Sequence, residues 1–421
     1  MAWIDRLIVI FTKFVSWMST SFGLGAGETW PGEIALALRP NIARALASKL
    51  ADGVILIAGT NGKTTTSLMV KTILEDIGES VVHNATGANL LNGVVSSFIR
   101  NSDWLGRITA DVGVFEIDEN SLPVFLRFIT PKRIILLNLF RDQLDRYGEV
   151  DVIVEKWQNA LATLPKSTTV ILTSDDPGVA SLGTSVKGAV IYFGLNDTPK
   201  FLKVHEHATD STFCPHCGNR LTYEGVYFSH IGVWKCTKCG YTRPKPAVSS
   251  WPSPLPGLYN RYNTLAAVAL ARSIDIPDHE IKKALRNFAP AFGRQEEVMV
   301  RGKMIKLFLS KNPAGFNMSL RTVLEMGAKE LLLVLNDRIP DGRDVSWIWD
   351  VDFEMIPKNV RITVSGDRVY DMELRIKYAG LQAQGEPDLR HALAVKRDTY
   401  VLATYSAMLE ARKILKGRKI L

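Results

Sequence analysis

The chain has 421 residues and a formal net charge of +8, and 46% of its residues are hydrophobic. This length predicts two or three domains with full cores, and the composition excludes a disordered chain. It has no secretory signal and no apolar run long enough to cross a bilayer, so a cytoplasmic location is expected. The positive charge suits nucleotides, phospholipid surfaces or nucleic acid without choosing among them.

Residues 1–32 are expected to form an N-terminal helix and a linker. The helix has one apolar face, formed by Trp3, Leu7, Ile10, Phe11, Phe14 and Met18. We expect this face to pack on its own domain; the alternative is contact with the inner face of a membrane. The Gly-rich stretch Phe22–Gly32 predicts a turn or linker before a helical segment, Ile34–Leu50.

A strand, a Gly-rich loop and a helix are predicted next. The β-branched run Val54–Ala58 indicates a buried parallel strand, and a helix follows from Ser67. The loop between them contains Gly59, Thr60, Asn61, Gly62, Lys63, Thr64 and Thr65, and its N–H groups can surround phosphate oxygens at the helix N-terminus. Lys63 would reach the terminal phosphates and the Thr64 hydroxyl would bind Mg²⁺, although Ile57 replaces the usual first glycine of a P-loop.

Strands and helices alternate after this loop. Further strands are expected at Val112–Ile117, Arg133–Leu139, Thr168–Thr173 and Ala189–Phe193. The alternation predicts a parallel sheet with helices on both faces and ligands at the carboxyl ends of its strands. Glu116 lies at such an end and suits the Mg²⁺ that bridges ATP phosphates; the alternative is a solvated acidic turn.

Four cysteines interrupt this pattern within residues 203–246. Cys214, Cys217, Cys236 and Cys239 form two C-x₂-C pairs, each followed by glycine. Four thiolates make a closed tetrahedral Zn²⁺ site, so we expect a structural zinc ribbon in which His216 takes no part. With all four cysteines on zinc, any thiolate nucleophile must come from another chain.

A second, smaller α/β domain is predicted for residues 296–421. Its expected strands are Met304–Phe308, Glu330–Leu335, Val360–Ser365 and Tyr400–Thr404, and its last helix is Ser406–Leu415. Residues 33–295 would form the ATP-binding middle domain, which includes the ribbon and ends in helices at Tyr262–Ile274 and His279–Phe288.

These motifs resemble those of the Mur ligases and folylpolyglutamate synthases. The loop resembles their ATP loop and Glu116 matches their Mg²⁺-binding glutamate. Leu172–Asp176 and the segment containing Asn263 look like the family's nucleotide segments, and Phe292–Glu296, with Arg294, looks like its hinge. The resemblance therefore implies ATP binding by the loop, Asn263 and Arg294. Gln143 stands where the family has a metal-binding histidine.

The closer resemblance is to the MurT subgroup, the Mur-ligase-like subunits of lipid II isoglutaminyl synthase. The segment Leu309–Asn317 replaces the family's Asp-Tyr-Ala-His-Asn-Pro, and the ribbon and Asn336–Asp350 fit the subgroup. This implies ATP-dependent phosphorylation of the α-carboxylate of D-glutamate in lipid II, followed by attack of ammonia from a GatD-type glutaminase. In the subgroup an aspartate completes the partner's Cys–His pair; we favour Asp344 over Asp350, with a simple turn residue as the alternative.

Two other functions compete with this interpretation. An amino-acid-adding ligase is disfavoured by Gln143 and by the replaced motif. A nucleic-acid-binding NTPase that reads through its ribbon is disfavoured because the ribbon lacks a basic, aromatic run. No nucleic-acid partner is therefore expected.

Overall fold

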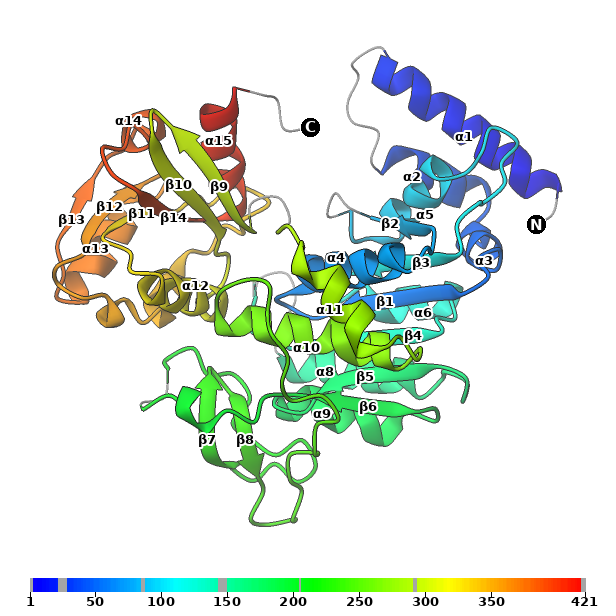
Figure 1. Cartoon of the computed structure of the whole chain (residues 1–421), viewed down its shortest axis with the longest axis horizontal. Coiled ribbons are helices and arrows are strands. Elements are labelled where there is room, and N and C mark those ends of the chain that lie inside the picture. Colours follow the sequence, from blue (N-terminus) through cyan, green and yellow to red (C-terminus); the bar gives the residue numbers. More distant parts are fainter. Residues whose placement is uncertain are drawn as a thin grey trace.

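The structure is a computed structural model that describes residues 3–21, 29–84, 88–142, 150–203, 206–290 and 294–417. Two α/β units, each built on a six-stranded sheet, lie side by side, and a two-stranded hairpin projects from the first unit (Figure 1). Among the described residues, no helix is both long and apolar enough to cross a bilayer.

The first sheet is entirely parallel and contains every strand predicted for this unit. Its order is β2 (Val81–His83), β3 (Val112–Glu116), β1 (Gly53–Ala58), β4 (Arg133–Leu136), β5 (Thr169–Thr173) and β6 (Val190–Phe193). The sequence did not predict β2, because three residues at a sheet edge carry no readable periodicity. Strand β4 ends three residues earlier than predicted, and the chain after it turns toward the loop that follows β1.

Helices cover both faces of this sheet, as the alternation predicted. Ile55 and Ile57 point to one face, which packs against α4 (Lys63–Asp76), α10 (Leu258–Arg272) and α11 (Asp278–Arg286). Val54 and Leu56 point to the other because successive side chains of a strand alternate. That face is covered by α3 (Ile42–Ala47), α5 (Leu91–Arg100), α6 (Leu122–Phe128) and α8 (Val150–Leu161).

The N-terminal region differs from its prediction. The expected helix Ile34–Leu50 is wrong: the chain forms α2 (Trp30–Leu38) and then α3, because Pro40 lacks the N–H that a continuous helix needs. Helix α2 also begins inside the expected linker, with Pro31 in its first turn. Helix α1 (Trp3–Ser21) forms as predicted, but the apolar face expected to pack is exposed.

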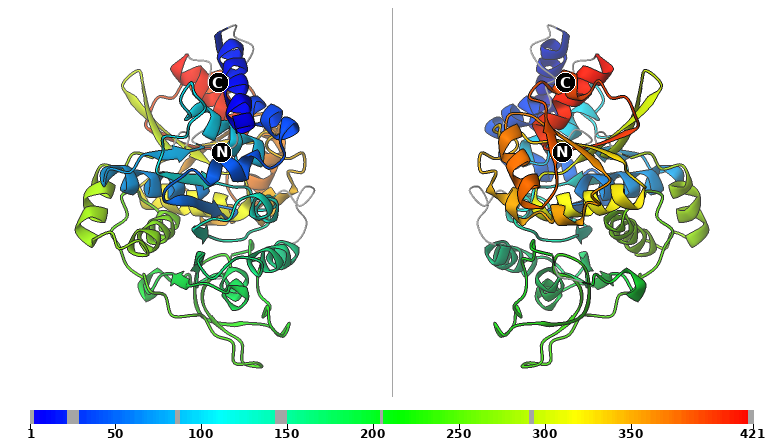
Figure 2. Two further views of the ribbon diagram at one scale, coloured as in Figure 1. Left: turned by 90° about the vertical axis from the view of Figure 1, so that its right-hand side faces the viewer. Right: turned by 90° about the vertical axis from the view of Figure 1, so that its left-hand side faces the viewer.

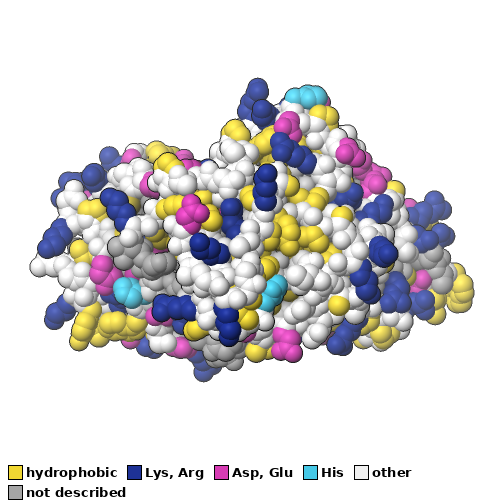
Figure 3. All heavy atoms as spheres, turned by 90° about the horizontal axis from the view of Figure 1, so that it is seen from below, with side chains coloured by type: hydrophobic (Ala, Val, Ile, Leu, Met, Phe, Trp, Pro, Cys, Tyr) yellow, Lys and Arg dark blue, Asp and Glu magenta, His cyan; other side chains and the backbone are white. Residues whose placement is uncertain are grey.

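The insertion carries β7 (Thr222–Phe228) and β8 (Ile231–Lys235), which pair antiparallel. Three short helices precede it in the chain: α9 (Pro177–Ser181), η1 (Leu182–Ser185) and η2 (Thr198–Lys200). Both views in Figure 2 place this hairpin and α1 at opposite ends of the molecule. Seen from the hairpin side, Lys and Arg side chains are spread across the whole face rather than gathered in one stripe (Figure 3).

The second sheet has the order β13 (Ala383–Gly385), β12 (Arg361–Ser365), β11 (Glu330–Val334), β14 (Thr399–Ala403), β10 (Lys303–Leu309) and β9 (Arg294–Val300). Only β9 is antiparallel, and the two strands missed from sequence, β9 and β13, are the edges. One face packs on α12 (Pro313–Glu325), α13 (Val369–Tyr378) and the short helices η3 (Ser346–Asp350) and η4 (Phe353–Met355). The other packs on α14 (Leu389–Ala392) and α15 (Tyr405–Lys416).

Candidate nucleotide and metal sites

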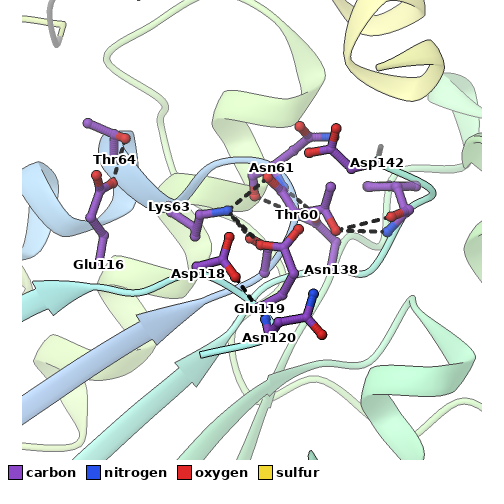
Figure 4. Close-up of polar contacts among 12 residues, drawn as sticks. Thr60, Asn61, Lys63, Thr64, Glu116, Asp118, Glu119, Asn120, Asn138 and Asp142 are labelled. Carbon is purple, nitrogen blue, oxygen red and sulfur yellow. Dashed lines mark hydrogen bonds and ion pairs between the residues drawn. The ribbon is translucent and has the colours of Figure 1, made fainter. Parts of the chain in front are cut away.

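The Gly-rich loop leaves the carboxyl end of β1 and is followed by a helix, as the sequence predicted (Figure 4). The helix, α4, begins at Lys63, four residues before the predicted start at Ser67. Gly62 has a φ of +91°, and a Cβ there would lie 2.1 Å from the Asn263 side-chain oxygen, so only glycine fits. Asn138, just past β4, fixes the loop: its Oδ1 accepts the Asn61 N–H at 2.9 Å and its carbonyl accepts the Thr60 N–H at 2.9 Å. These contacts tie the loop to the chain that follows β4.

The Lys63 ammonium lies at the mouth of this loop. It donates to the Gly59 carbonyl at 2.5 Å, to the Thr60 carbonyl at 3.1 Å and to the Glu119 carboxylate at 3.1 Å. Burial of Glu119 would raise its pKa, but Lys63 and Lys311 together hold that pKa below its usual range. Burial and the neighbouring Glu119 raise the pKa of Asp118 instead. The mouth thus holds an ionised carboxylate between two lysines.

Two hard oxygen ligands meet beside the loop. The Thr64 hydroxyl donates to the Glu116 carboxylate at 2.5 Å and accepts a hydrogen bond from Arg294 at 2.9 Å. Asn84 on the neighbouring strand end holds the Glu116 backbone from both sides, at 3.0 and 2.8 Å. A hydroxyl and a buried carboxylate are ligands that Mg²⁺ accepts, so the residues present fit that ion. Burial lowers the pKa of Arg294.

The second α/β unit adds two side chains to this site that the sequence did not single out. Lys311 forms an ion pair with Asp142, and although burial would lower its pKa, Asp142 and Glu119 raise it. The Asn312 amide exchanges hydrogen bonds with the Asn61 amide, at 3.3 and 3.2 Å. Both residues lie in the replaced motif Leu309–Asn317, which is their signal in the sequence.

A cavity lies between the loop and the two units. Its walls come from the loop and α4, from α10 and from α12, together with residues of β9 and β10; they include Asn61, Gly62, Thr65, Tyr259, Asn260, Asn263, Arg294, Gln295, Gly315 and Ser319. Five of the nine predicted ATP-binding residues line this cavity: Asn61, Gly62, Thr65, Asn263 and Arg294. Of the other four, Lys63 contacts Gly59 and Thr60, and Thr64 is hydrogen-bonded to Arg294.

Asp175 and Asp176, from a predicted nucleotide segment, do not line this cavity. Both are fully buried at the end of β5. Asp175 accepts hydrogen bonds from the Tyr262 hydroxyl at 2.6 Å and from Arg243 of the insertion at 2.7 Å. Asp176 caps α9 and lies 3.3 Å from His230. These carboxylates fasten the insertion to the sheet.

The four cysteines of the insertion come together as predicted. Their sulfurs all lie within 4.8 Å of one another, with Cys214–Cys239 at 3.6 Å and Cys217–Cys236 at 3.5 Å. Four thiolates around Zn²⁺ at about 2.3 Å would stand roughly 3.8 Å apart, so the cluster could hold such an ion. His216 is exposed and stacks on Tyr241, outside the cluster.

The two candidate triad aspartates differ in their surroundings. Asp344 is exposed, and its carboxylate accepts the Ser346 N–H at 2.8 Å, a hydrogen bond that lowers its pKa. Asp350 lies 3.4 Å from Arg141 of the first unit. Neither aspartate lines the nucleotide cavity.

The insertion also contacts the second unit. Glu206, which is buried, accepts two hydrogen bonds from Arg321 of α12, at 3.0 and 2.8 Å. Arg141 pairs with Asp210 of the insertion as well as with Asp350.

Two predicted features cannot be placed in the structure. Gln143, Phe292 and the remainder of residues 143–149 and 291–293 lie outside the described residues.

Comparisons with known proteins agree with this architecture. Residues 57–271 match the family model of the Mur ligase middle domain, and residues 309–408 match that of the MurT ligase C-terminal domain. A pseudomurein peptide ligase type C from Methanothermus fervidus superposes with a TM-score of 0.68 at 21% identity, over 89% of this chain and 80% of that one. The fold is therefore that of the Mur ligases, a class of ATP-dependent enzymes.

Comparison with relatives in sequence identifies the group of Mur ligases to which this chain belongs. The MurT subunit of lipid II isoglutaminyl synthase from Staphylococcus aureus (strain COL) is 33% identical over 89% of this chain and 86% of the relative. The MurT subunit from Streptococcus pneumoniae (strain ATCC BAA-255 / R6) is 31% identical over 94% of both chains. The chain belongs to the MurT family of Mur ligases.

Proposed function

We propose that this chain is the synthase subunit of a lipid II isoglutaminyl synthase. It would use ATP to amidate the α-carboxylate of D-glutamate in the peptidoglycan precursor lipid II, giving D-isoglutamine. The relatives with this name cover about nine tenths of the chain, and the site holds the parts that carboxylate activation needs. The main support is that Lys63 and Lys311, cations from the two units, both act on Glu119 beside the Thr64–Glu116 pair. Two such cations would stabilise the charge that develops on a transferred phosphate.

The reaction would proceed through an acyl phosphate. A carboxylate oxygen attacks the γ-phosphorus of ATP and ADP departs; ammonia then attacks the acyl carbon, loses a proton and displaces phosphate. Lys63 and the loop N–H groups would hold the phosphates, and Lys311, which stays protonated because of Asp142 and Glu119, would neutralise charge on the transferred group. Thr64 and Glu116 would hold Mg²⁺, which would offset the negative charge of the phosphates.

Ammonia would come from a partner glutaminase. Release of the amide nitrogen of glutamine by thiolate attack needs a cysteine, and all four cysteines of this chain lie in one cluster. We infer that the cluster binds structural Zn²⁺ and that a GatD-type subunit supplies the nucleophile. Asp344, exposed beside η3, would complete that subunit's Cys–His pair, whereas Asp350 is engaged by Arg141.

Purified chain, ATP, Mg²⁺ and lipid II test this proposal. With ammonium we expect amidated lipid II by mass spectrometry and one ADP per product; with glutamine we expect product only after the glutaminase is added. Glutamine hydrolysis by this chain alone would contradict the cysteine argument. Addition of an amino acid in place of ammonia would favour an amino-acid-adding ligase instead.

Metal analysis tests the zinc assignment separately. The purified chain should contain one equivalent of zinc, and Cys236→Ser should lose it, whereas His216→Ala should retain it because His216 stands outside the cluster. Full zinc occupancy in Cys236→Ser, or zinc loss in His216→Ala, would contradict the four-cysteine site.

A further inference from the structure

Helix α1 exposes its apolar face, whereas an amphipathic helix usually packs its apolar face against its own domain. Its buried side includes two polar residues, Asp5 and Thr12, together with Val9. Asp5 forms an ion pair with Arg39 of the chain just after α2, and the Thr12 hydroxyl donates to the Ile8 carbonyl at 2.8 Å. The inner face is therefore satisfied by polar contacts, and most large apolar side chains of the helix point outward.

The outward face is a continuous apolar surface. At 100° per residue its members fall within one side of the helix, and each is exposed: Trp3, Ile4, Leu7, Phe11, Phe14, Trp17 and Met18. Trp3 is 74% exposed and Trp17 is 53% exposed, and these tryptophans lie at opposite ends of the face. A solvent-exposed face of this size marks an interaction site rather than a packed helix.

A neighbouring loop extends this face. Gly106 lies against the N-terminal end of α1, where a Cβ would stand 2.9 Å from the Arg6 carbonyl. The same loop presents Trp104 and Leu105, each 57% exposed, and Lys13 of α1 lies over the Trp104 ring at 5.4 Å. Helix α1 and this loop thus share one surface, which we call the α1 face.

The charges around the α1 face favour an anionic surface as its occupant. Within α1 and residues 103–107, the charged residues that are exposed are the cations Arg6 and Arg107. The two carboxylates have partners within the protein: Asp5 is paired with Arg39, and Asp103 interacts with the nearby Lys13 and accepts two backbone N–H groups, at 2.9 and 2.7 Å. Tryptophans with flanking cations are typical of helices that lie in the headgroup region of a bilayer.

We propose that the α1 face docks this protein on an anionic lipid bilayer, with α1 lying in the plane of the membrane surface. The purpose of this docking rests on the proposed function. Lipid II is anchored in a bilayer, so a protein that docks on the bilayer surface would meet its acceptor there. The hairpin β7–β8 then points away from the bilayer, since it lies at the opposite end of the molecule (Figure 2).

Vesicle co-sedimentation of the full chain tests the docking. We expect binding to vesicles containing phosphatidylglycerol and much weaker binding to pure phosphatidylcholine. The double variant Leu7→Glu/Phe11→Glu should lower binding about tenfold or more, because it places two carboxylates at the lipid interface. The matched control Met299→Glu/Leu374→Glu changes exposed apolar residues of the second unit and should bind as the unaltered chain does. Equal binding by all three proteins would overturn the proposal.

Two further measurements keep the test decisive. If the helix variant misfolds, Trp104→Ser/Leu105→Ser probes the same face from the loop and should also weaken binding. Sedimentation velocity without lipid tests a second copy of this chain as the occupant: a dimer abolished by Leu7→Glu/Phe11→Glu, with no vesicle binding by the unaltered chain, would overturn membrane docking.

Amidation of a water-soluble stem-peptide acceptor should be unchanged in the helix variant Leu7→Glu/Phe11→Glu. Absence of that activity in the unaltered chain would refute the proposed function while leaving the vesicle result intact.

Discussion

Asn61 of the Gly-rich loop and Asn312 of the second α/β unit exchange two side-chain hydrogen bonds, at 3.3 and 3.2 Å, across 251 residues of sequence. Asn312 also caps α12, since its Oδ1 accepts the Gly315 N–H at 2.8 Å. The contact joins the phosphate loop to the N-terminus of a helix in the other unit. Part of the candidate site is therefore formed by the contact between the two units.

Asn312→Asp should separate these two roles of Asn312. The carboxylate keeps the helix cap but removes the amide donor to Asn61 and adds a negative charge next to the loop. We expect unchanged thermal stability and about a tenfold loss in kcat/KM for ATP, the value of one hydrogen bond of about 1–1.5 kcal/mol. Asn312→Ala, which loses the cap as well, should also lose about 1 kcal/mol of stability. An unaltered rate in Asn312→Asp would show that the contact is not used in turnover.

Lys63→Ala should remove phosphate stabilisation. We expect kcat to fall about 10²- to 10³-fold, because a buried cation aimed at the transferred group is lost. Lys71→Ala on the same helix is the matched control: Lys71 pairs with Glu75 at 2.8 Å on the outer side of α4, and its removal should leave kcat unchanged. Coupled measurement of ADP release compares the two, and equal rates would refute the role of Lys63.

Asp344→Asn should distinguish the two ammonia sources. Loss of the group that orients the partner's imidazole would lower glutamine-dependent amidation about 10²- to 10⁴-fold, with ammonium-dependent amidation unchanged. Asp350→Asn breaks the contact with Arg141 and should leave the ratio of the two rates unchanged. The reverse outcome would assign the orienting role to Asp350.

Arg321→Ala should loosen the contact between the insertion and the second unit. Burial raises the pKa of Glu206 although Arg321 opposes this, so removal of Arg321 leaves a buried carboxylate poorly paired. We expect a loss of about 1–3 kcal/mol in unfolding free energy. The loss should be smaller at acidic than at alkaline pH, because a carboxyl with a raised pKa takes up a proton more readily as the pH falls. The exposed pair Lys200–Glu325, 3.8 Å apart, is the control, and Glu325→Ala should cost less than about 0.5 kcal/mol. Similar losses in both variants would contradict this expectation.

His83 should make the protein sensitive to acid. Burial and the neighbouring Lys71 lower its pKa from 6.5 to about 4, so the unfolded chain binds a proton that the folded chain excludes between these values. Stability should fall as the pH drops from 6.5 toward 4, by about 3 kcal/mol at most. Urea denaturation at pH 7 and pH 4.5 measures this slope. His83→Gln should flatten it and His279→Gln, at an exposed position, should not.

The sequence by itself determined the local chemistry of this protein. The β-branched run into Gly59, the C-x₂-C pairs and the alternation of strands and helices each lie within a few dozen residues, where periodicity and spacing are readable. They were enough to predict the first sheet, the loop before α4 and the clustering of the four cysteines, all of which the structure contains. The sequence did not predict the short edge strands β2 and β13 or the helix break at Pro40, because a strand of three residues or a single proline changes the hydrophobic pattern too little.

Only the tertiary structure decided which distant residues meet. Lys311 and Asn312 reach the loop from another unit, and Asp175 turns inward to hold the insertion, because packing of whole units fixes where these side chains point. The outward orientation of the apolar face of α1 was also beyond the sequence. An amphipathic pattern defines two faces of a helix, but which one is buried depends on contacts such as Asp5 with Arg39.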